Sequence, residues 1–331
     1  MSEDIDYIIE TDEINTRNKF PIIAQLGILG VILLGLFGSL LWGKNDTEPV
    51  LTPETPVASA FVTQEPIVPE KLEEIEIFAS SAYVWDVKGQ RALYSKNADE
   101  QLPLASITKL MTTLLAYELV EENTEASVSL SAIMQEGSSG LVAGEKFEAE
   151  KLRELALISS SNDAAFALAA SVGALLGDND PTSQFVDGMN IRAKELGLES
   201  LQFWNTTGLD ISTTKPGSVG SAKDVSFLME YIITNHPEII SPTQKSTARI
   251  YNTEGAYHEI SNTNEAVLDI PNMIGSKTGY TDLAGGNLTV AFDAGLNRPI
   301  IITVLGSSRN GRFTDVLTLV KAVQKSVGAQ Q

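Results

Sequence analysis

The sequence predicts an α+β fold in which helices flank an antiparallel sheet. Early in the chain, Ser81–Asp86 and Arg91–Ser95 are strand-like segments on either side of Lys88-Gly89, a pattern typical of a hairpin. Strand-like segments return only near the C-terminus, where short connections favour antiparallel pairing. The long stretch between these strands carries apolar residues at helical spacing, which predicts a helical insertion subdomain.

The individual elements follow from apolar periodicity. A helix is predicted to start near Ser106, just after Pro103, because apolar residues follow at helical spacing as far as Leu119. The same spacing predicts helices at Ala149–Ile158, Asp163–Leu176, Pro181–Leu196 and Ala222–Thr234. Late strands are predicted at Asn272–Thr281, Gly286–Asp293 and Arg298–Leu305, followed by a final helix that stops at Gly328.

The folded domain, predicted over residues 75–331, is preceded by three segments of different composition. Residues 1–19 are polar and acidic and are expected to form a short cytoplasmic tail. Residues 20–42 carry no charged side chain and would extend roughly 35 Å as a helix, which is enough to cross a bilayer. We therefore expect a transmembrane anchor there. Residues 43–74, rich in Pro, Thr and Glu, are expected to form an extended linker.

Charges around the apolar stretch predict its orientation. Arg17 and Lys19 precede it and Lys44 follows it, which favours a cytoplasmic N-terminus. We therefore expect a single-pass protein of the cell membrane whose folded domain lies outside the cytoplasm. Gly43-Lys-Asn-Asp46 is not a small-residue cleavage site, so an uncleaved anchor is favoured over a signal peptide.

The composition excludes several kinds of chemistry. The formal net charge of -20 argues against nucleic acid as a partner. The chain has no cysteine, so disulfides, thiolate metal sites and a cysteine nucleophile are excluded. His236 and His258 are the two histidines, too few for a His-rich metal cluster. No Gly-x-Ser-x-Gly elbow accompanies them, which disfavours a Ser-His-Asp hydrolase.

Ser106-Ile-Thr-Lys109 is the first motif with chemical content. On a helix, positions i and i+3 share a face, so the Lys109 amine can reach the Ser106 hydroxyl. A serine hydroxyl becomes an effective nucleophile when a neighbouring base takes its proton, and a lysine that burial keeps neutral can be this base. Taken alone, the motif is more typical of a solvated helix face, because Ser-x-x-Lys is expected about once by chance in a chain of this size.

Two further stretches have polar patterns of the same kind. Ser160-Ser161-Asn162 lies between two predicted helices, where it could also be an ordinary N-cap cluster. Lys277-Thr278-Gly279 lies in an extended segment with a glycine on each side of the lysine. Such glycines allow a ligand backbone to lie against the strand, although a surface lysine before a turn would give the same pattern.

Together and in this order, the three motifs resemble those of the serine-active penicillin-binding proteins and serine β-lactamases. Over about residues 76–325 the chain is more closely similar to the D-alanyl-D-alanine carboxypeptidases of low molecular mass, through Met189–Gly197, Phe203–Asp210, Asn262–Asn264, Val304–Gly306 and Gly311-Arg312. The resemblance implies a β-lactamase/transpeptidase-like fold and cleavage of the terminal D-Ala-D-Ala bond of peptidoglycan stem peptides. It also implies covalent inhibition by β-lactams, and a reaction through serine that needs no metal or organic cofactor.

The resemblance also assigns roles to individual residues. Ser106 would be the nucleophile, Lys109 the base, and Ser160 the relay that protonates the leaving amine. The substrate would be bound by Asn162, Lys277, Thr278, Gly279, Tyr280 and Arg312, with the N–H groups of Ser106 and Tyr280 forming the oxyanion hole. A guanidinium fork suits a carboxylate, which favours Arg312, but Arg309 is close enough in sequence to take this role.

Three other functions remain open at this point. A D,D-endopeptidase acting on peptidoglycan cross-links would use the same residues. A class A β-lactamase needs a Glu in a Glu-x-x-Leu-Asn stretch, and the nearest counterpart, Glu195–Glu199, fits the carboxypeptidase pattern better. An inactive module that senses peptidoglycan or β-lactams should have lost a motif residue, and none is missing.

Overall fold

The computed structural model describes residues 71–72, 75–137 and 139–328. The predicted tail at 1–19, the predicted anchor at 20–42 and almost all of the predicted linker at 43–74 lie outside these residues. None of the helices in the described part of the chain combines the length and the apolar character that crossing a bilayer requires.

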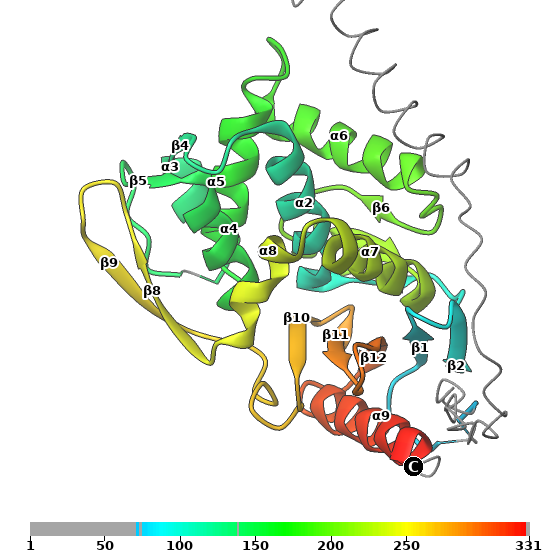
Figure 1. Ribbon diagram of the computed structural model, residues 1–331. Helices are drawn as coiled ribbons and strands as arrows, with labels where there is room; N and C mark the ends of the chain where they lie inside the picture. The colour runs from blue at the N-terminus through cyan, green and yellow to red at the C-terminus, as the bar shows by residue number, and fades with distance from the viewer. Residues whose placement is uncertain (1–70, 73–74, 138, 329–331) are drawn as a thin grey trace, which may run out of the picture. The chain divides into compact units, whose positions relative to one another are not determined.

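A five-stranded antiparallel sheet lies at the centre of the described domain, in the order β10-β11-β12-β1-β2 (Figure 1). Its strands are β1 (Ser81–Asp86), β2 (Arg91–Lys96), β10 (Met273–Thr281), β11 (Gly285–Asp293) and β12 (Pro299–Ser307). Because β1 pairs with β12, the sheet joins the early hairpin to the late strands. The predicted antiparallel sheet is confirmed, and β10 lies at its edge.

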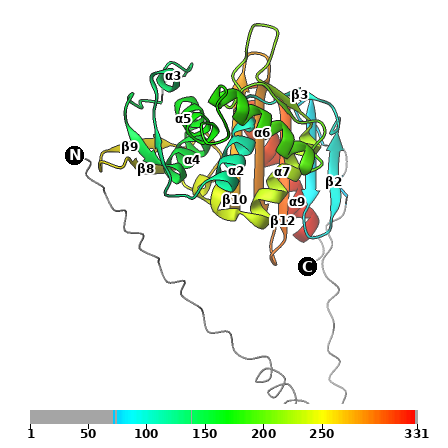
Figure 2. The ribbon, with the colours of Figure 1, turned by 90° about the horizontal axis from the view of Figure 1, so that it is seen from above.

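Two helices cover opposite faces of this sheet, as the alternation of side chains along a strand requires. On β12, Ile301 and Leu305 share a core with α7 (Ala222–Asn235). The alternate residues Ile300, Ile302 and Val304 share a second core with α9 (Gly311–Gly328). Figures 1 and 2 show α7 and α9 on the two sides of the strands. β12 is therefore buried on both faces.

The insertion between the early and late strands is helical, as predicted (Figure 2). Its helices are α2 (Lys109–Leu119), α3 (Leu130–Ile133), α4 (Ala149–Ile158), α5 (Asn162–Gly173) and α6 (Pro181–Glu195). They share one core with the α7 side of the sheet. The prediction that α5 runs to Leu176 was wrong. Leu175 and Leu176 are largely exposed, so their apolar character does not mark a buried helical face.

Short elements complete the domain, and periodicity did not predict them because each is five residues or fewer. A three-stranded sheet in the order β3-β7-β6 and the pair β4-β5 lie beside the helices, and β8-β9 form a projecting hairpin (Figure 1). These strands are β3 (Leu102–Pro103), β4 (Glu125–Ser127), β5 (Lys146–Glu148), β6 (Gln202–Phe203), β7 (Ser218–Gly220), β8 (Thr247–Tyr251) and β9 (Tyr257–Ser261). The remaining helical turns are α8 (Pro237–Ile240) and the 3₁₀ turns η1 (Ala105–Thr108) and η2 (Ser241–Gln244).

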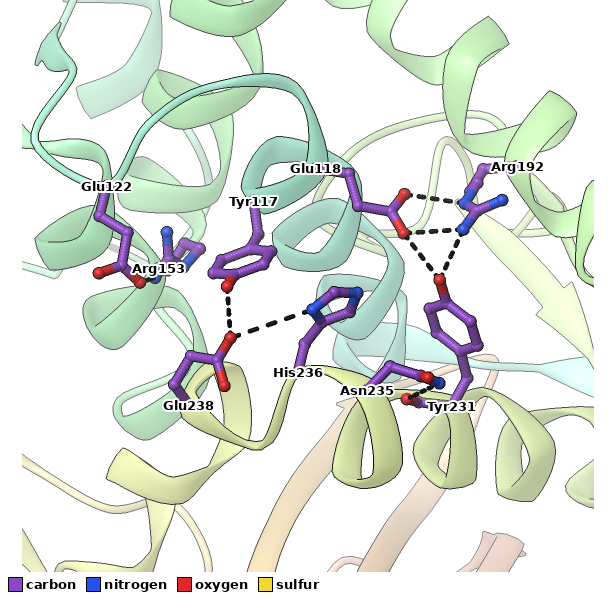
Figure 3. Close-up of polar contacts among 9 residues, drawn as sticks. All are labelled: Tyr117, Glu118, Glu122, Arg153, Arg192, Tyr231, Asn235, His236 and Glu238. Atoms are coloured by element: carbon purple, nitrogen blue, oxygen red, sulfur yellow. Dashed lines mark hydrogen bonds and ion pairs between the residues drawn. The ribbon is translucent and has the colours of Figure 1, made fainter. Parts of the chain in front are cut away.

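A polar cluster fixes the C-terminal end of α2, the helix that begins with Lys109 (Figure 3). Arg192 of α6 donates to both oxygens of Glu118, at 2.8 Å each, and also to the Tyr231 hydroxyl of α7. The Tyr117 hydroxyl donates to Glu238 of α8. Since these contacts come from three other helices, the end of α2 opposite Lys109 is held in place.

Candidate active site

Ser106 lies in the 3₁₀ turn η1, and α2 begins three residues later at Lys109. The prediction of a single α-helix starting near Ser106 was therefore wrong in detail. A 3₁₀ turn has about three residues per turn, so the side chains at i and i+3 are eclipsed. Lys109 Nζ accordingly lies 2.8 Å from Ser106 Oγ. Ala105, just before the serine, has a φ of 49°, in the left-handed region.

The amine of Lys109 is buried and has three oxygen neighbours. Besides Ser106 Oγ, it contacts Asn162 Oδ1 at 2.7 Å and the carbonyl of Thr207 at 2.8 Å. Burial disfavours the charged form and lowers the pKa of Lys109 to about 7. A substantial fraction of the amines is thus neutral near pH 7, which is the state that a general base requires.

Ser160 and Asn162 flank the serine that caps α5. The cap is Ser161, whose hydroxyl accepts from the Ala164 N–H. This leaves the side chains on either side of it free for other contacts. Ser160 has a φ of 60°, which is unusual for a residue with a Cβ and is a form of strain often found at functional sites. Asn162 uses its oxygen for Lys109 and donates its N–H to the carbonyl of Glu136.

Lys277 brings the third motif to the same place from the edge strand β10. Its amine donates to Ser160 Oγ and to the carbonyl of Thr278, at 2.9 Å each. The pKa of Lys277 is lowered well below its usual value, chiefly by burial and further by the charges of Lys109 and Arg312. The three motifs, far apart in sequence, therefore converge on a single cluster in which each serine contacts its own lysine.

Gly279 is required by the protein's own backbone. A Cβ there would lie 2.7 Å from the carbonyl oxygen of Leu104 and 3.3 Å from Ala105 Cβ. The strand thus packs directly against the turn that carries Ser106. The sequence suggested instead that this glycine makes room for a ligand backbone. Gly208 has the same kind of role, since a Cβ there would lie 1.9 Å from the carbonyl oxygen of Ala105.

The alternation of β10 determines which backbone groups face the outer edge of the sheet. The Ser276 N–H donates to Thr243, away from β11, and the N–H groups of residues two and four positions further along point the same way. The Tyr280 N–H therefore faces the outer edge of β10. An outward N–H next to the Ser106 turn suits the predicted oxyanion hole.

Arg312 and Arg309 occupy different environments beside β10. Arg312 is buried and donates to the carbonyl of Gly279 at 2.6 Å, and burial lowers its pKa to about 10. Arg309 is exposed and lies over the Tyr280 ring, with its guanidinium carbon 5.0 Å from the ring centroid. Thr278, the remaining predicted binding residue, is buried and shares a 2.6 Å hydrogen bond with Thr263. All the predicted site residues thus lie around β10, η1 and the start of α5.

Asn287 is a site residue that the sequence did not reveal. This fully buried side chain on β11 donates to the carbonyls of Pro103 and Leu104 and accepts from the Gly306 N–H. It thereby fixes the chain immediately before the Ser106 turn. The available signal was an amide in the predicted buried strand Gly286–Asp293. Among the described residues, no cluster of His, Asp or Glu side chains could hold a metal ion.

Comparisons with known proteins agree with this geometry. The family profile of peptidase S11, described as D-alanyl-D-alanine carboxypeptidase, matches residues 66–309. The chain belongs to this family of serine peptidases. It is 30% identical to the D-alanyl-D-alanine carboxypeptidase DacF of Bacillus subtilis over 78% of this chain, and it spans 65% of that protein's length. It is 28% identical to a D-alanyl-D-alanine endopeptidase of Escherichia coli, with coverage of 72% and 74%.

Solved structures place the S11 domain among the penicillin-binding proteins. Penicillin-binding protein D2 of Listeria monocytogenes, solved in an ampicillin-bound form, is 28% identical with a TM-score of 0.63. The match covers 76% of this chain and 99% of that one. A Streptomyces K15 DD-transpeptidase, at 22% identity and a TM-score of 0.67 over 77% of this chain, shares the fold. The predicted β-lactamase/transpeptidase-like fold is thereby confirmed for the described domain.

Proposed function

We propose that this S11 protein is a membrane-anchored D,D-carboxypeptidase that removes the terminal D-Ala from peptidoglycan stem peptides through an acyl-enzyme. The observation that carries the proposal is the buried Lys109 amine, 2.8 Å from the Ser106 hydroxyl, with Asn162 and the Thr207 carbonyl as its other contacts. This is the arrangement that an amine needs to remove a proton from a serine nucleophile.

In the first half of the proposed reaction, Ser106 Oγ attacks the carbonyl carbon of the penultimate D-Ala while Lys109 takes its proton. The N–H groups of Ser106 and Tyr280 donate to the oxyanion that forms. The C–N bond then breaks as Ser160 passes its hydroxyl proton to the leaving amine, and the proton that Lys109 took from Ser106 replaces it. Lys277 stays hydrogen-bonded to Ser160 during this transfer. D-Ala departs with its own carboxylate, and an ester remains on Ser106. Water subsequently hydrolyses this ester and returns the proton to the serine.

Recognition of the terminal carboxylate is assigned to the basic side of the cluster. Lys277, Thr278 and Arg312 are buried next to one another along β10. A bound carboxylate favours the charged forms of these side chains and offsets part of the cost of their burial. A substrate that ends in a free carboxylate is therefore preferred to a neutral one.

Residues 20–42 are assigned as the anchor, with the S11 domain outside the cytoplasm. This assignment rests on the uncharged apolar stretch and on the basic residues before it. The predicted linker then separates the domain from the membrane surface. Protease added to spheroplasts, whose cytoplasmic membrane is intact and whose outer layers are removed, should digest the domain and spare residues 1–19. Protection of the domain in spheroplasts and digestion only after lysis would refute the assignment.

The test of the activity uses the full chain in detergent, with peptides that end in D-Ala-D-Ala. D-Ala release by the wild type and none by Ser106→Ala is the expected result. D-Ala release by Ser106→Ala at the wild-type rate would refute the mechanism. A relative named endopeptidase favours a second candidate, hydrolysis of cross-links. Cross-linked muropeptides assayed in parallel separate the two, the acyl-enzyme lifetime with penicillin separates both from a β-lactamase, and release of D-Ala separates both from an inactive sensor module.

A further inference from the structure

The turn at residues 205–209 presents a backbone carbonyl to the catalytic lysine, and α2 holds this turn at two points. Thr112 Oγ1 donates to the carbonyl of Thr206 at 2.7 Å, and Lys109 Nζ lies 2.8 Å from the carbonyl of Thr207. The turn belongs to the stretch Phe203–Asp210, whose pattern the proposed mechanism does not yet use.

The Thr207 carbonyl helps to decide where the lone pair of Lys109 points. A neutral amine has two N–H donors and one lone pair, whereas an ammonium has three donors. When the neutral amine donates to Asn162 Oδ1 and to the Thr207 carbonyl, its lone pair remains for the third neighbour, the Ser106 hydroxyl. Loss of either acceptor would allow the amine to rotate and to donate toward Ser106 instead of accepting its proton.

The position of the Thr207 carbonyl depends on the turn around it. The side chain of Asn205 contacts three residues of this turn. Asn205 Oδ1 accepts from the Gly208 N–H at 2.7 Å and from the Thr207 N–H at 3.2 Å. Its Nδ2 donates to the carbonyl of Leu209 at 2.8 Å. Gly217 leaves space for this amide, because a Cβ at that position would lie 2.5 Å from Asn205 Nδ2. The amide thus connects both sides of the carbonyl that faces Lys109.

We infer that Asn205 is a positioning residue for the catalytic base: it holds the Thr207 carbonyl against Lys109 Nζ and so directs the free amine toward Ser106. The inference rests on the proposed function and goes beyond it, because Asn205 does not contact Ser106 or Lys109. The titratable group that faces Lys109 from β10 is Lys277, and its contacts do not involve the turn.

Two substitutions of Asn205 should move the titration of Lys109 in opposite directions. In Asn205→Ala the carbonyl is no longer held at the amine, so the ammonium loses a favourable dipole and the pKa of Lys109 falls. In Asn205→Asp a carboxylate is added to the same turn, so the ammonium is stabilised and the pKa rises. The fall in Asn205→Ala is the diagnostic shift, because a carboxylate near Lys109 raises its pKa whatever the role of Asn205.

The experiment uses the full chain, with two readouts for each variant. The first is the rate constant of acylation by a fluorescent penicillin across pH, and the second is the NMR titration of the labelled Lys109 side chain. Asn205→Ala is expected to lower the plateau of acylation by about tenfold or more and to move the acidic limb to lower pH. Asn205→Asp is expected to move that limb to higher pH.

Asn190→Ala is the matched control, because Asn190 makes the same kind of amide clamp on Phe203, two residues before the turn. Its acylation rate constant should lie within about threefold of the wild-type value, and the acidic limb of its pH profile should not shift. A wild-type acylation rate constant and a wild-type pKa of Lys109 in Asn205→Ala would overturn the inference. Equal losses of acylation rate in Asn205→Ala and Asn190→Ala, without a shift in the pKa of Lys109, would overturn it as well. If the wild type is never labelled, the proposed function fails, and the NMR titration still decides whether Asn205 sets the pKa of Lys109.

Discussion

The amine of Lys277 lies 2.9 Å from the hydroxyl of Ser160, a residue whose φ of 60° places it in the left-handed region. This contact joins β10 to the start of α5, so that Ser160, like Ser106, has a lysine amine within hydrogen-bond distance. The geometry is maintained at a conformational cost, because a side chain with a Cβ disfavours this backbone conformation.

Two substitutions of Ser160 should distinguish the loss of its hydroxyl, which affects activity, from the relief of its backbone strain, which affects stability. Ser160→Ala and Ser160→Gly both lose the proton relay, so D-Ala release should fall by about a hundredfold or more in each. Glycine adopts the positive φ freely, so Ser160→Gly should be more stable to unfolding than Ser160→Ala by about 1 kcal/mol. Urea unfolding and a D-Ala release assay give the two values. Near-wild-type turnover in both variants would remove Ser160 from the mechanism.

Acylation should depend on pH through Lys109. The neutral amine is the active form, and burial lowers the pKa of Lys109 to about 7. The rate should therefore be highest above this pH and should fall about tenfold per unit well below it, as the amine becomes protonated. A stopped-flow profile with a fluorescent penicillin measures this limb. A rate that stays flat from pH 8 to pH 5, where folding is intact, would show that Lys109 is not the base.

A carboxamide substrate should reveal which arginine recognises the terminal carboxylate. Arg312 is buried beside Lys277, whereas Arg309 lies over the exposed ring of Tyr280. We expect the wild type to prefer a peptide ending in D-Ala over its D-alaninamide analogue by about tenfold or more in kcat/KM. Arg312→Ala should lose most of this preference, and Arg309→Ala should keep it. The reverse pattern would assign the carboxylate to Arg309.

Asn287 should be needed for both stability and acylation. Asn287→Ala removes the donor shared by the carbonyls of Pro103 and Leu104, at a cost of about 1–3 kcal/mol in the free energy of unfolding. Because these carbonyls directly precede the Ser106 turn, acylation should slow as well. Thr289→Val, on the same strand, loses a buried hydroxyl contact to Thr303 without touching this segment. It should lose stability but keep its acylation rate, and equal slowing in both variants would argue against a specific role for Asn287.

The parts of the site that the sequence predicted are those with a distinctive side chain at a fixed spacing. Ser106, Lys109, Ser160, Asn162 and Lys277 occur in short motifs, and the structure brings all five together. The central sheet was predictable because its late strands are long and apolar. The early hairpin and the late strands, however, join into one sheet through the pairing of β1 with β12, which no local pattern specifies.

The parts that were missed depend on backbone groups and on very short elements. The Thr207 carbonyl contacts the base through an atom that every residue has, so the identity of residue 207 carries no signal. The 3₁₀ turn at Ser106 spans four residues, too few for apolar periodicity to distinguish it from an α-helix. The close approach of Leu104 to Gly279 joins segments 175 positions apart, and a glycine in a strand only hints at such a contact.

Mass spectrometry of the full chain after brief exposure to penicillin, followed by digestion to locate the adduct, tests directly whether Ser106 is the nucleophile. We expect one added penicilloyl group per chain, on the peptide that contains Ser106, and no adduct in Ser106→Ala. An adduct on another residue, or an unmodified wild-type protein that is folded and still releases D-Ala, would contradict this assignment.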